Sequence, residues 1–397
     1  MGLLLNVDYG DYLAKARGRE VLKKAAPKYI ELEEAVDAYY IHYRRPIFGG
    51  RSNSDVWRRF VLLYVNSPYY EKIASMCRLR HRPSLDAAVK LIHAFERYLD
   101  NIGFRKWTWW GRGRHEVWTL EGLRQLRRSF GDPEEAAYLY QIFKKLGEVL
   151  GRGRSGDPAS LAISMASDPR RLRLAEKLAK SLRLAQVLAP HLGGERGAWD
   201  VSWDIVSTGS VEKLPKATPA SRSLYLGALP LFLYKLATAS LVIRSGVLHG
   251  VRGLYLLVDK SGSMFSLVGG YEKIVLATAY AIAAVRHFRK HVLRFFDVDI
   301  YSEVTGVGDL VDVLSRVAAS GGTDLTRAIE AAVEDAERKR LRGYVLHIVT
   351  DGEDDYFDSS VLQKARRVFA SVLMVLIGER KPPQGASYIR LLPPRGL

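Results

Sequence analysis

The chain has 397 residues, of which 48% are hydrophobic and 26% charged, a balance that is typical of folded globular domains and excludes wholesale disorder. A single cysteine excludes an intrachain disulfide and a multi-cysteine zinc site, and it favours a reducing, cytoplasmic setting. The net charge of +17 divides into +15 for residues 1–249 and +2 for residues 250–397. The positive charge of the first part favours acidic proteins, nucleic acid or anionic lipid as partners. A solvated arginine-rich surface explains the charge at least as well.

Residues 1–192 are predicted to form a basic, mainly helical domain. The chain starts with a short apolar run without basic residues ahead of it, so we expect no signal peptide. Ser84 is expected to cap one helix. Three pairs, in which an aspartate caps a helix and a proline takes its first position, mark further helix starts. These pairs are Asp132-Pro133, Asp157-Pro158 and Asp168-Pro169.

The segment Trp107–Trp118 mixes tryptophans with arginines and glycines. Aromatic rings that stack on bases and arginines that bind phosphates would suit single-stranded nucleic acid. The spacing fits equally two short strands across a Gly-Arg-Gly turn, with the tryptophans packed on helices. We favour the packing role, because no recognised nucleic-acid module surrounds the segment.

Residues 193–245 are predicted to be a connector with a docking helix. Glycine, proline and tryptophan interrupt every periodic pattern in the first part of this stretch. The run Leu224–Ile243 is apolar and about as long as a membrane span. It contains Pro230, Lys235 and several small residues, which favour a buried or amphipathic helix between domains. We therefore predict no transmembrane segment.

Residues 246–397 alternate between apolar strands and amphipathic helices. This order predicts an α/β doubly wound, Rossmann-like sheet. A short edge strand over Ile300–Thr305 is also expected. The main strands are predicted at Leu254–Val258, Val292–Phe296, Tyr344–Val349 and Val372–Ile377.

Oxygen-bearing side chains follow two of these strands and precede one helix. Parallel strands carry functional groups beyond their carboxyl ends, so these side chains are expected to meet at one edge. Hard oxygen ligands suggest Mg²⁺ or Mn²⁺, whereas the alternative is that they only cap helices. The predicted metal ligands are Asp259, Ser261, Ser263, Thr323 and Asp351. Further acids nearby are expected to be solvated loop charges, not ligands: Asp297, Asp299, Glu353, Asp354 and Asp355.

The element Asp259-Lys260-Ser261-Gly262-Ser263, followed in order by Thr323 and Asp351, resembles the von Willebrand factor type A (VWA) domain and its metal-ion-dependent adhesion site. The resemblance covers about residues 245–380. It implies that both serines bind Mg²⁺ directly, that Thr323 binds directly or through water, and that the aspartates bind through water. Neutral hydroxyls leave much of the cation's charge uncompensated, so a carboxylate of another protein would complete the shell.

We expect no catalysis, because the sequence offers no general base, nucleophile or Gly-x-x-x-x-Gly-Lys-Ser/Thr phosphate loop. The whole arrangement resembles CoxE/ViaA-type proteins, which work with MoxR-type AAA+ ATPases. This resemblance implies an adaptor in protein or metallo-complex remodelling, whose metal site binds a partner or client and whose helical part contacts the ATPase. The alternative is a Ro-like RNA-binding protein that uses the basic helical domain, although we detect no helical repeat array of that kind.

Overall fold

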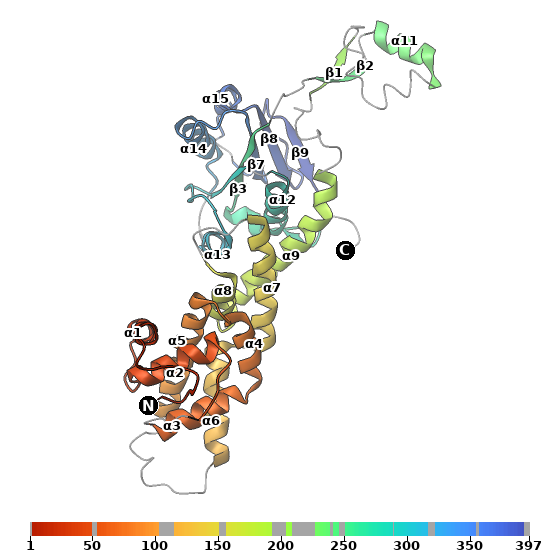
Figure 1. The fold of residues 1–397 in the computed structure, drawn as a ribbon. Coiled ribbons are helices and arrows are strands. Elements are labelled where there is room, and N and C mark those ends of the chain that lie inside the picture. Colours follow the sequence, from red (N-terminus) through yellow and green to blue (C-terminus); the bar gives the residue numbers. More distant parts are fainter. Residues whose placement is uncertain are drawn as a thin grey trace. The chain divides into compact units, whose positions relative to one another are not determined.

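A computed structural model describes residues 2–49, 54–102, 115–150, 156–192, 204–208, 227–238, 241–245, 251–288, 290–316, 322–354 and 357–392. The chain divides into two compact units (Figure 1). The first, the helical unit, comprises Met1–Ala179 and Thr305–Ser315. The second, the α/β unit, comprises Lys180–Val304 and Arg316–Leu397.

The helical unit is built around its helix α5, which contacts α1, α2, α4, α6 and α8. An apolar face of α5 is fully buried, and Phe95 packs its ring against Trp57, Phe60 and Tyr98. The predicted helical character of this region is confirmed. The helices are α1 (Tyr12–Ala25), α2 (Leu32–Tyr43), α3 (Asp55–Val65), α4 (Pro68–Cys77), α5 (His81–Ile102), α6 (His115–Phe130), α7 (Pro133–Leu150), α8 (Pro158–Met165), the first part of α9 (Pro169–Leu192), and α13 (Val307–Ser315).

The three Asp-Pro pairs start helices as predicted. In each pair the aspartate accepts a hydrogen bond from the backbone of the helix's first turn, at 2.7 Å for Asp132, 2.9 Å for Asp157 and 2.9 Å for Asp168. The expected cap at Ser84 is wrong. Helix α5 begins three residues earlier, at His81, and the Ser84 hydroxyl donates to the carbonyl of Arg80 over 2.8 Å. Proline at position 83 is tolerated there because it lies in the first turn.

Helix α13 belongs to the helical unit although the residues on both sides of it belong to the α/β unit. It packs on α7 and α8. Its buried apolar residues, which include Val307, Leu310 and Val311, therefore complete the core of the helical unit.

The α/β unit has a five-stranded sheet in the order β6-β3-β7-β8-β9, with every pair parallel. The predicted fold class is confirmed. Strand β3 lies between β6 and β7 and is buried along its whole length, as an apolar run covered on both faces requires. The strands are β3 (Gly253–Asp259), β6 (His291–Phe296), β7 (Tyr344–Thr350), β8 (Ser371–Ile377) and β9 (Tyr388–Leu391).

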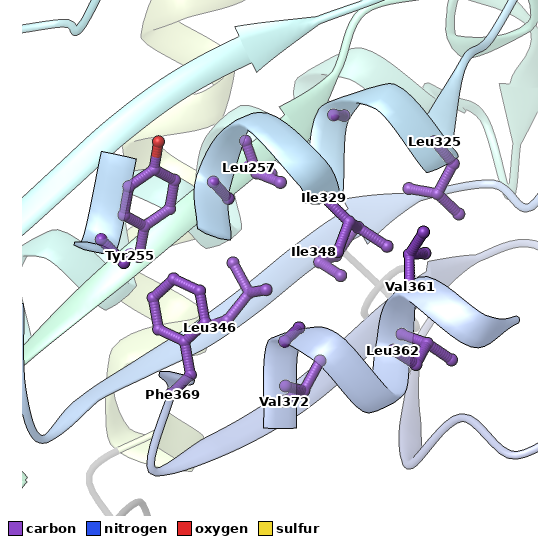
Figure 2. Close-up of a cluster of buried hydrophobic side chains, with 14 of the residues drawn as sticks. Tyr255, Leu257, Leu325, Ile329, Leu346, Ile348, Val361, Leu362, Phe369 and Val372 are labelled. Atoms are coloured by element: carbon purple, nitrogen blue, oxygen red, sulfur yellow. The ribbon is translucent and has the colours of Figure 1, made fainter. Parts of the chain in front are cut away.

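Helices α14 (Leu325–Arg338) and α15 (Ser360–Val368) cover one face of this sheet. Figure 2 shows Tyr255 and Leu257 of β3 with Leu346 and Ile348 of β7 in the resulting apolar cluster. His347, which points to the opposite face because side chains alternate along a strand, contacts Tyr280 of α12 (Lys273–His287) over 3.0 Å. Helix α12 therefore covers the second face.

Two predictions about elements need correction, and one strand was not predicted. Ile300–Thr305 is not a strand, since only Ile300 forms an isolated bridge, to Phe296. Strand β9 was not anticipated. The run Leu224–Ile243 is not one helix: α11 spans Leu229–Ala237, and Leu241–Ser245 forms β2, which pairs antiparallel with β1 (Asp204–Thr208). In the part of the chain that the structure describes, no helix is long and apolar enough to cross a membrane.

The Trp107–Trp118 segment lies mostly outside the described residues. Its last residues, from His115 onward, begin helix α6 and do not form the second strand of the expected pair. Of the connector and docking helix predicted over 193–245, residues 193–203, 209–226 and 239–240 also lie outside the described residues.

Candidate metal centre at the carboxyl edge of the sheet

The candidate site lies where the order of the sheet reverses. Numbered along the chain, the strands run 2-1-3-4-5, and the reversal falls between β3 and β7. Open α/β sheets bind their ligands outside the carboxyl ends of the strands at this point. Asp259 is the last residue of β3, and Asp351 directly follows the last residue of β7. The topology therefore places the two predicted carboxylates at the same edge.

Asp259 is completely buried and both of its carboxylate oxygens accept hydrogen bonds. The backbone N–H of Ser261 donates to Oδ1 over 2.8 Å, and the hydroxyl of Thr350 donates to Oδ2 over 2.7 Å. Burial raises the pKa of Asp259 to about 6, although these hydrogen bonds favour its ionised form. Such a fixed carboxylate is suited to orient the loop and to hold a water on a cation.

The two serine hydroxyls of the motif lie within hydrogen-bonding distance of each other. Ser263 lies in a short 3₁₀ helix, Gly262–Phe265, and its Oγ is 3.1 Å from the Oγ of Ser261. Adjacent ligands of an octahedral Mg²⁺ with metal–oxygen distances of about 2.1 Å lie about 3.0 Å apart. The spacing of the two hydroxyls therefore fits two neighbouring positions of a magnesium shell.

Thr323 lies in a segment that is fixed to the loops after β6 and β7. The backbone N–H of Asp324 donates to the carbonyl of Asp297, after β6, over 3.0 Å. The N–H of Leu325 donates to the carboxylate of Asp354, after β7, over 2.9 Å. Because β3 lies between β6 and β7, these two bonds hold the segment at the carboxyl end of β3. The preceding Ser320 and Gly321 lie outside the described residues.

Asp351 is buried and forms an ion pair that the sequence did not reveal. The ammonium of Lys273, the first residue of α12, lies 2.7 Å from Oδ2 of Asp351 and 3.5 Å from Oε1 of Glu353. Oδ1 of Asp351 accepts a hydrogen bond of 3.2 Å from the N–H of Glu353. Lysine at position 273 carries no motif signal, because its partner lies 78 residues away.

Lys260, the second residue of the motif, fixes the motif loop to neighbouring loops of the α/β unit. Its buried ammonium lies 3.5 Å from Oδ2 of Asp297 and 4.0 Å from the ring centroid of Tyr301, and it donates to the carbonyl of Arg316. Burial lowers the pKa of Lys260, while Asp297 acts in the opposite direction. The lysine therefore joins the motif to the chain segment that leads towards Thr323.

The expectation that the additional acids are only solvated is wrong for three of them. Asp297 is buried beside Lys260, Glu353 lies beside Lys273, and Asp354 accepts the N–H of Leu325. The Asp299 side chain is 76% exposed, as expected for a solvated charge. Asp355 lies outside the described residues.

The donors in this arrangement fit a hard cation. Among the described residues, no three side chains of the types His, Cys, Asp and Glu gather as a metal site. A cation at this edge would instead use the hydroxyls of Ser261 and Ser263 together with the carboxylates of Asp259 and Asp351. Oxygen donors of this kind suit Mg²⁺ or Mn²⁺.

A parallel sheet of this order with this loop set at its edge defines a VWA domain. Residues 240–385 match the family described as "VWA domain containing CoxE-like protein". The chain therefore carries a VWA domain of the CoxE-like family over these residues.

One solved structure that is similar to this chain is the crystal structure of the Deinococcus radiodurans RO (RSR) protein. It shares 14% sequence identity, covers 96% of this chain and 88% of that chain, and has a TM-score of 0.26. A similarity at this level supports no conclusion about function. No protein with a curated description matches the sequence.

Proposed function

We propose that this protein is a non-catalytic adaptor that binds an acidic group of a protein partner or client through a divalent cation. The cation is Mg²⁺ or Mn²⁺. The observation that carries the proposal is the pair of hydroxyls on Ser261 and Ser263, 3.1 Å apart and next to the buried Asp259. The residues that would hold the cation are Asp259, Ser261, Ser263, Thr323 and Asp351.

The chemistry of these residues favours docking. Two neutral hydroxyls neutralise little of the charge of a divalent cation, and Mg²⁺ keeps waters at its remaining coordination positions. A carboxylate from another protein gains both a coordination bond and charge neutralisation when it replaces one of these waters. Both oxygens of Asp259 accept hydrogen bonds and Asp351 is paired with Lys273, so these carboxylates are poorly placed to act as a general base.

The CoxE-like family supports a protein partner, and we propose that this partner includes a MoxR-type AAA+ ATPase. The sequence has no phosphate-binding Gly-x-x-x-x-Gly-Lys-Ser/Thr loop, so the ATPase would supply the energy for remodelling. The helical unit, which has a net charge of +9, would contact it. RNA binding by the same basic residues is the alternative that the tests must separate.

The metal is tested by equilibrium binding of Mn²⁺, followed by electron paramagnetic resonance with Mg²⁺ as competitor. We expect one Mn²⁺ per chain for the wild type and none for Ser263→Ala. Ser266→Ala is the matched control: this serine lies in the same loop but its hydroxyl donates to the carbonyl of Ser263. Equal Mn²⁺ binding by Ser263→Ala and the wild type would contradict the proposal.

The partner is tested by co-purification with a MoxR-type ATPase from the same organism. Capture should require Mg²⁺, stop with EDTA, and be lost in Ser263→Ala but not in Ser266→Ala. RNA binding, measured by fluorescence anisotropy, should by contrast weaken steeply with salt. Strong RNA binding without Mg²⁺-dependent capture of protein would favour the alternative.

A further inference from the structure

Lys273 and the candidate cation share one carboxylate. The Lys273 ammonium lies 2.7 Å from Oδ2 of Asp351, a residue that would also hold the proposed cation. We propose that Lys273 is a built-in competitor of the divalent cation and thereby sets how tightly the site binds Mg²⁺. This inference rests on the proposed function, because it concerns the affinity of the same site.

The ion pair is well protected from solvent. Only 11% of the Lys273 side chain and 1% of the Asp351 side chain are exposed, so water and salt screen their attraction weakly. The backbone also fixes the lysine, since its N–H donates to the carbonyl of Ser266 over 3.0 Å. Lys273 is thus attached to the same loop that presents Ser263, only a short hairpin away (β4, Leu267–Val268; β5, Tyr271–Glu272).

The carboxylate of Glu353 is a second ion-pair partner for the Lys273 ammonium. Oε1 of Glu353 lies 3.5 Å from the same ammonium, and the Glu353 side chain is 37% exposed at the rim. When a divalent cation attracts Asp351, Lys273 retains Glu353 as its partner. Cation binding therefore transfers the ammonium from the buried carboxylate to the exposed one, and it does not leave a buried charge unpaired.

The sign of the effect follows from electrostatics. A positive charge next to a cation site disfavours the cation, because like charges repel and because Lys273 already neutralises Asp351. Without Lys273, one positive charge fewer opposes the attraction between the cation and the carboxylates of Asp259 and Asp351. The site then binds divalent ions more tightly.

The test is the dissociation constant for Mn²⁺, measured on the full chain by electron paramagnetic resonance and by calorimetry. Lys273→Met is expected to bind Mn²⁺ at least about tenfold more tightly than the wild type, a difference of about 1.4 kcal/mol. Lys339→Met is the matched control. Lys339 forms an ion pair of 2.7 Å with Glu303 and follows the far end of α14, about 20 Å along the helix from its start at the site.

Equal or weaker Mn²⁺ binding by Lys273→Met than by the wild type would overturn the competitor role and leave the adaptor proposal standing. If neither protein binds Mn²⁺, the proposed function itself fails. The two failures are therefore distinguishable. If Lys273→Met does not fold, as judged by circular dichroism, Lys273→Gln replaces it, with the same expectation.

A double-mutant cycle with Glu353→Gln tests the transfer directly. Glu353→Gln removes the second partner of Lys273, so it should weaken Mn²⁺ binding by the wild type. It should weaken binding by Lys273→Met much less, because no lysine is left to be held on Asp351. Equal effects of Glu353→Gln in both backgrounds would show that Glu353 acts only as a distant charge and would refute the transfer.

Discussion

The hydroxyl of Thr350 donates a hydrogen bond of 2.7 Å to Oδ2 of Asp259. This bond joins the last residues of two neighbouring strands, β7 and β3, across the point where the sheet order reverses. The Thr350 oxygen also accepts the N–H of Gly352 over 3.1 Å. One buried side chain thus links the loop of Ser261 to the loop of Asp351.

Replacement of this threonine should therefore affect both stability and metal binding. Thr350→Val keeps the shape but leaves a buried oxygen of Asp259 without its donor, which should destabilise the protein by about 1–3 kcal/mol. Thr350→Ser retains the hydroxyl and is the control. Urea unfolding and Mn²⁺ binding measure the two effects. If Thr350→Val and Thr350→Ser have the same free energy of unfolding and the same affinity for Mn²⁺, the hydrogen bond contributes nothing.

Mg²⁺ should stabilise the folded protein if the site binds it. At a concentration about 100 times its dissociation constant, a ligand that binds only the folded state contributes about 2.7 kcal/mol. The wild type should therefore melt at a higher temperature in Mg²⁺ than in EDTA, as followed by calorimetry. Ser266→Ala should keep this difference and Ser263→Ala should lose it. The same difference in all three proteins would place the stabilising ion elsewhere.

A buried ion-pair network fixes the core on the opposite side of the sheet from α12. Oδ2 of Asp335 accepts hydrogen bonds from the hydroxyl of Tyr255 over 3.0 Å and from Nη1 of Arg294 over 2.6 Å. Asp335 is 4% exposed. Burial acts to raise its pKa, but Tyr255 and Arg294 outweigh burial and hold the pKa below its usual range.

Asp335→Ala should cost about 3–5 kcal/mol of unfolding free energy, because it leaves the Arg294 guanidinium without its carboxylate. Tyr255→Phe should cost only about 1 kcal/mol, the usual net value of one hydrogen bond. The matched control is Glu334→Ala, at an exposed neighbouring position of the same helix. Urea denaturation gives all three values, and equal losses for Asp335→Ala and Glu334→Ala would refute the network's role.

The stability of the helical unit should depend on pH through His42. This histidine is fully buried; its Nδ1–H donates to the carbonyl of Ala38 over 2.7 Å, and its Nε2 accepts the hydroxyl of Tyr64 over 2.8 Å. Burial lowers the pKa of His42 to about 4 from 6.5. The unfolded state therefore binds a proton more readily between these values, so the contribution of neutral His42 to stability is lost as pH falls below about 6.5.

The measurement compares the wild type with His42→Gln by urea unfolding at pH 7.5 and pH 5.5. The stability advantage of the wild type should shrink by about 1 kcal/mol at the lower pH. The comparison cancels the opposite contribution of Asp37, whose pKa burial raises to about 6 and whose ionisation therefore disfavours folding as pH rises. An advantage that stays constant between the two pH values would contradict the prediction.

The elements with strong local signals were predictable. Three aspartates followed by proline start α7, α8 and α9, because the cap and the first turn are decided within four residues. The apolar run over β3 likewise indicates a buried parallel strand. The predictions of a strand over Ile300–Thr305 and of one helix over Leu224–Ile243 were wrong, because local periodicity does not specify which residues their apolar side chains contact.

The sequence by itself determined the α/β class of the carboxyl-terminal part and the residues that offer oxygen ligands, because alternating strands and helices and a five-residue motif are short-range patterns. That these ligands bind Mg²⁺ stays a prediction. Tertiary structure alone decided that Thr350 holds Asp259, that Lys273 holds Asp351, and that α13 joins the helical unit. These partners lie far apart along the chain, and only the order of the strands and the packing of the helices bring them together.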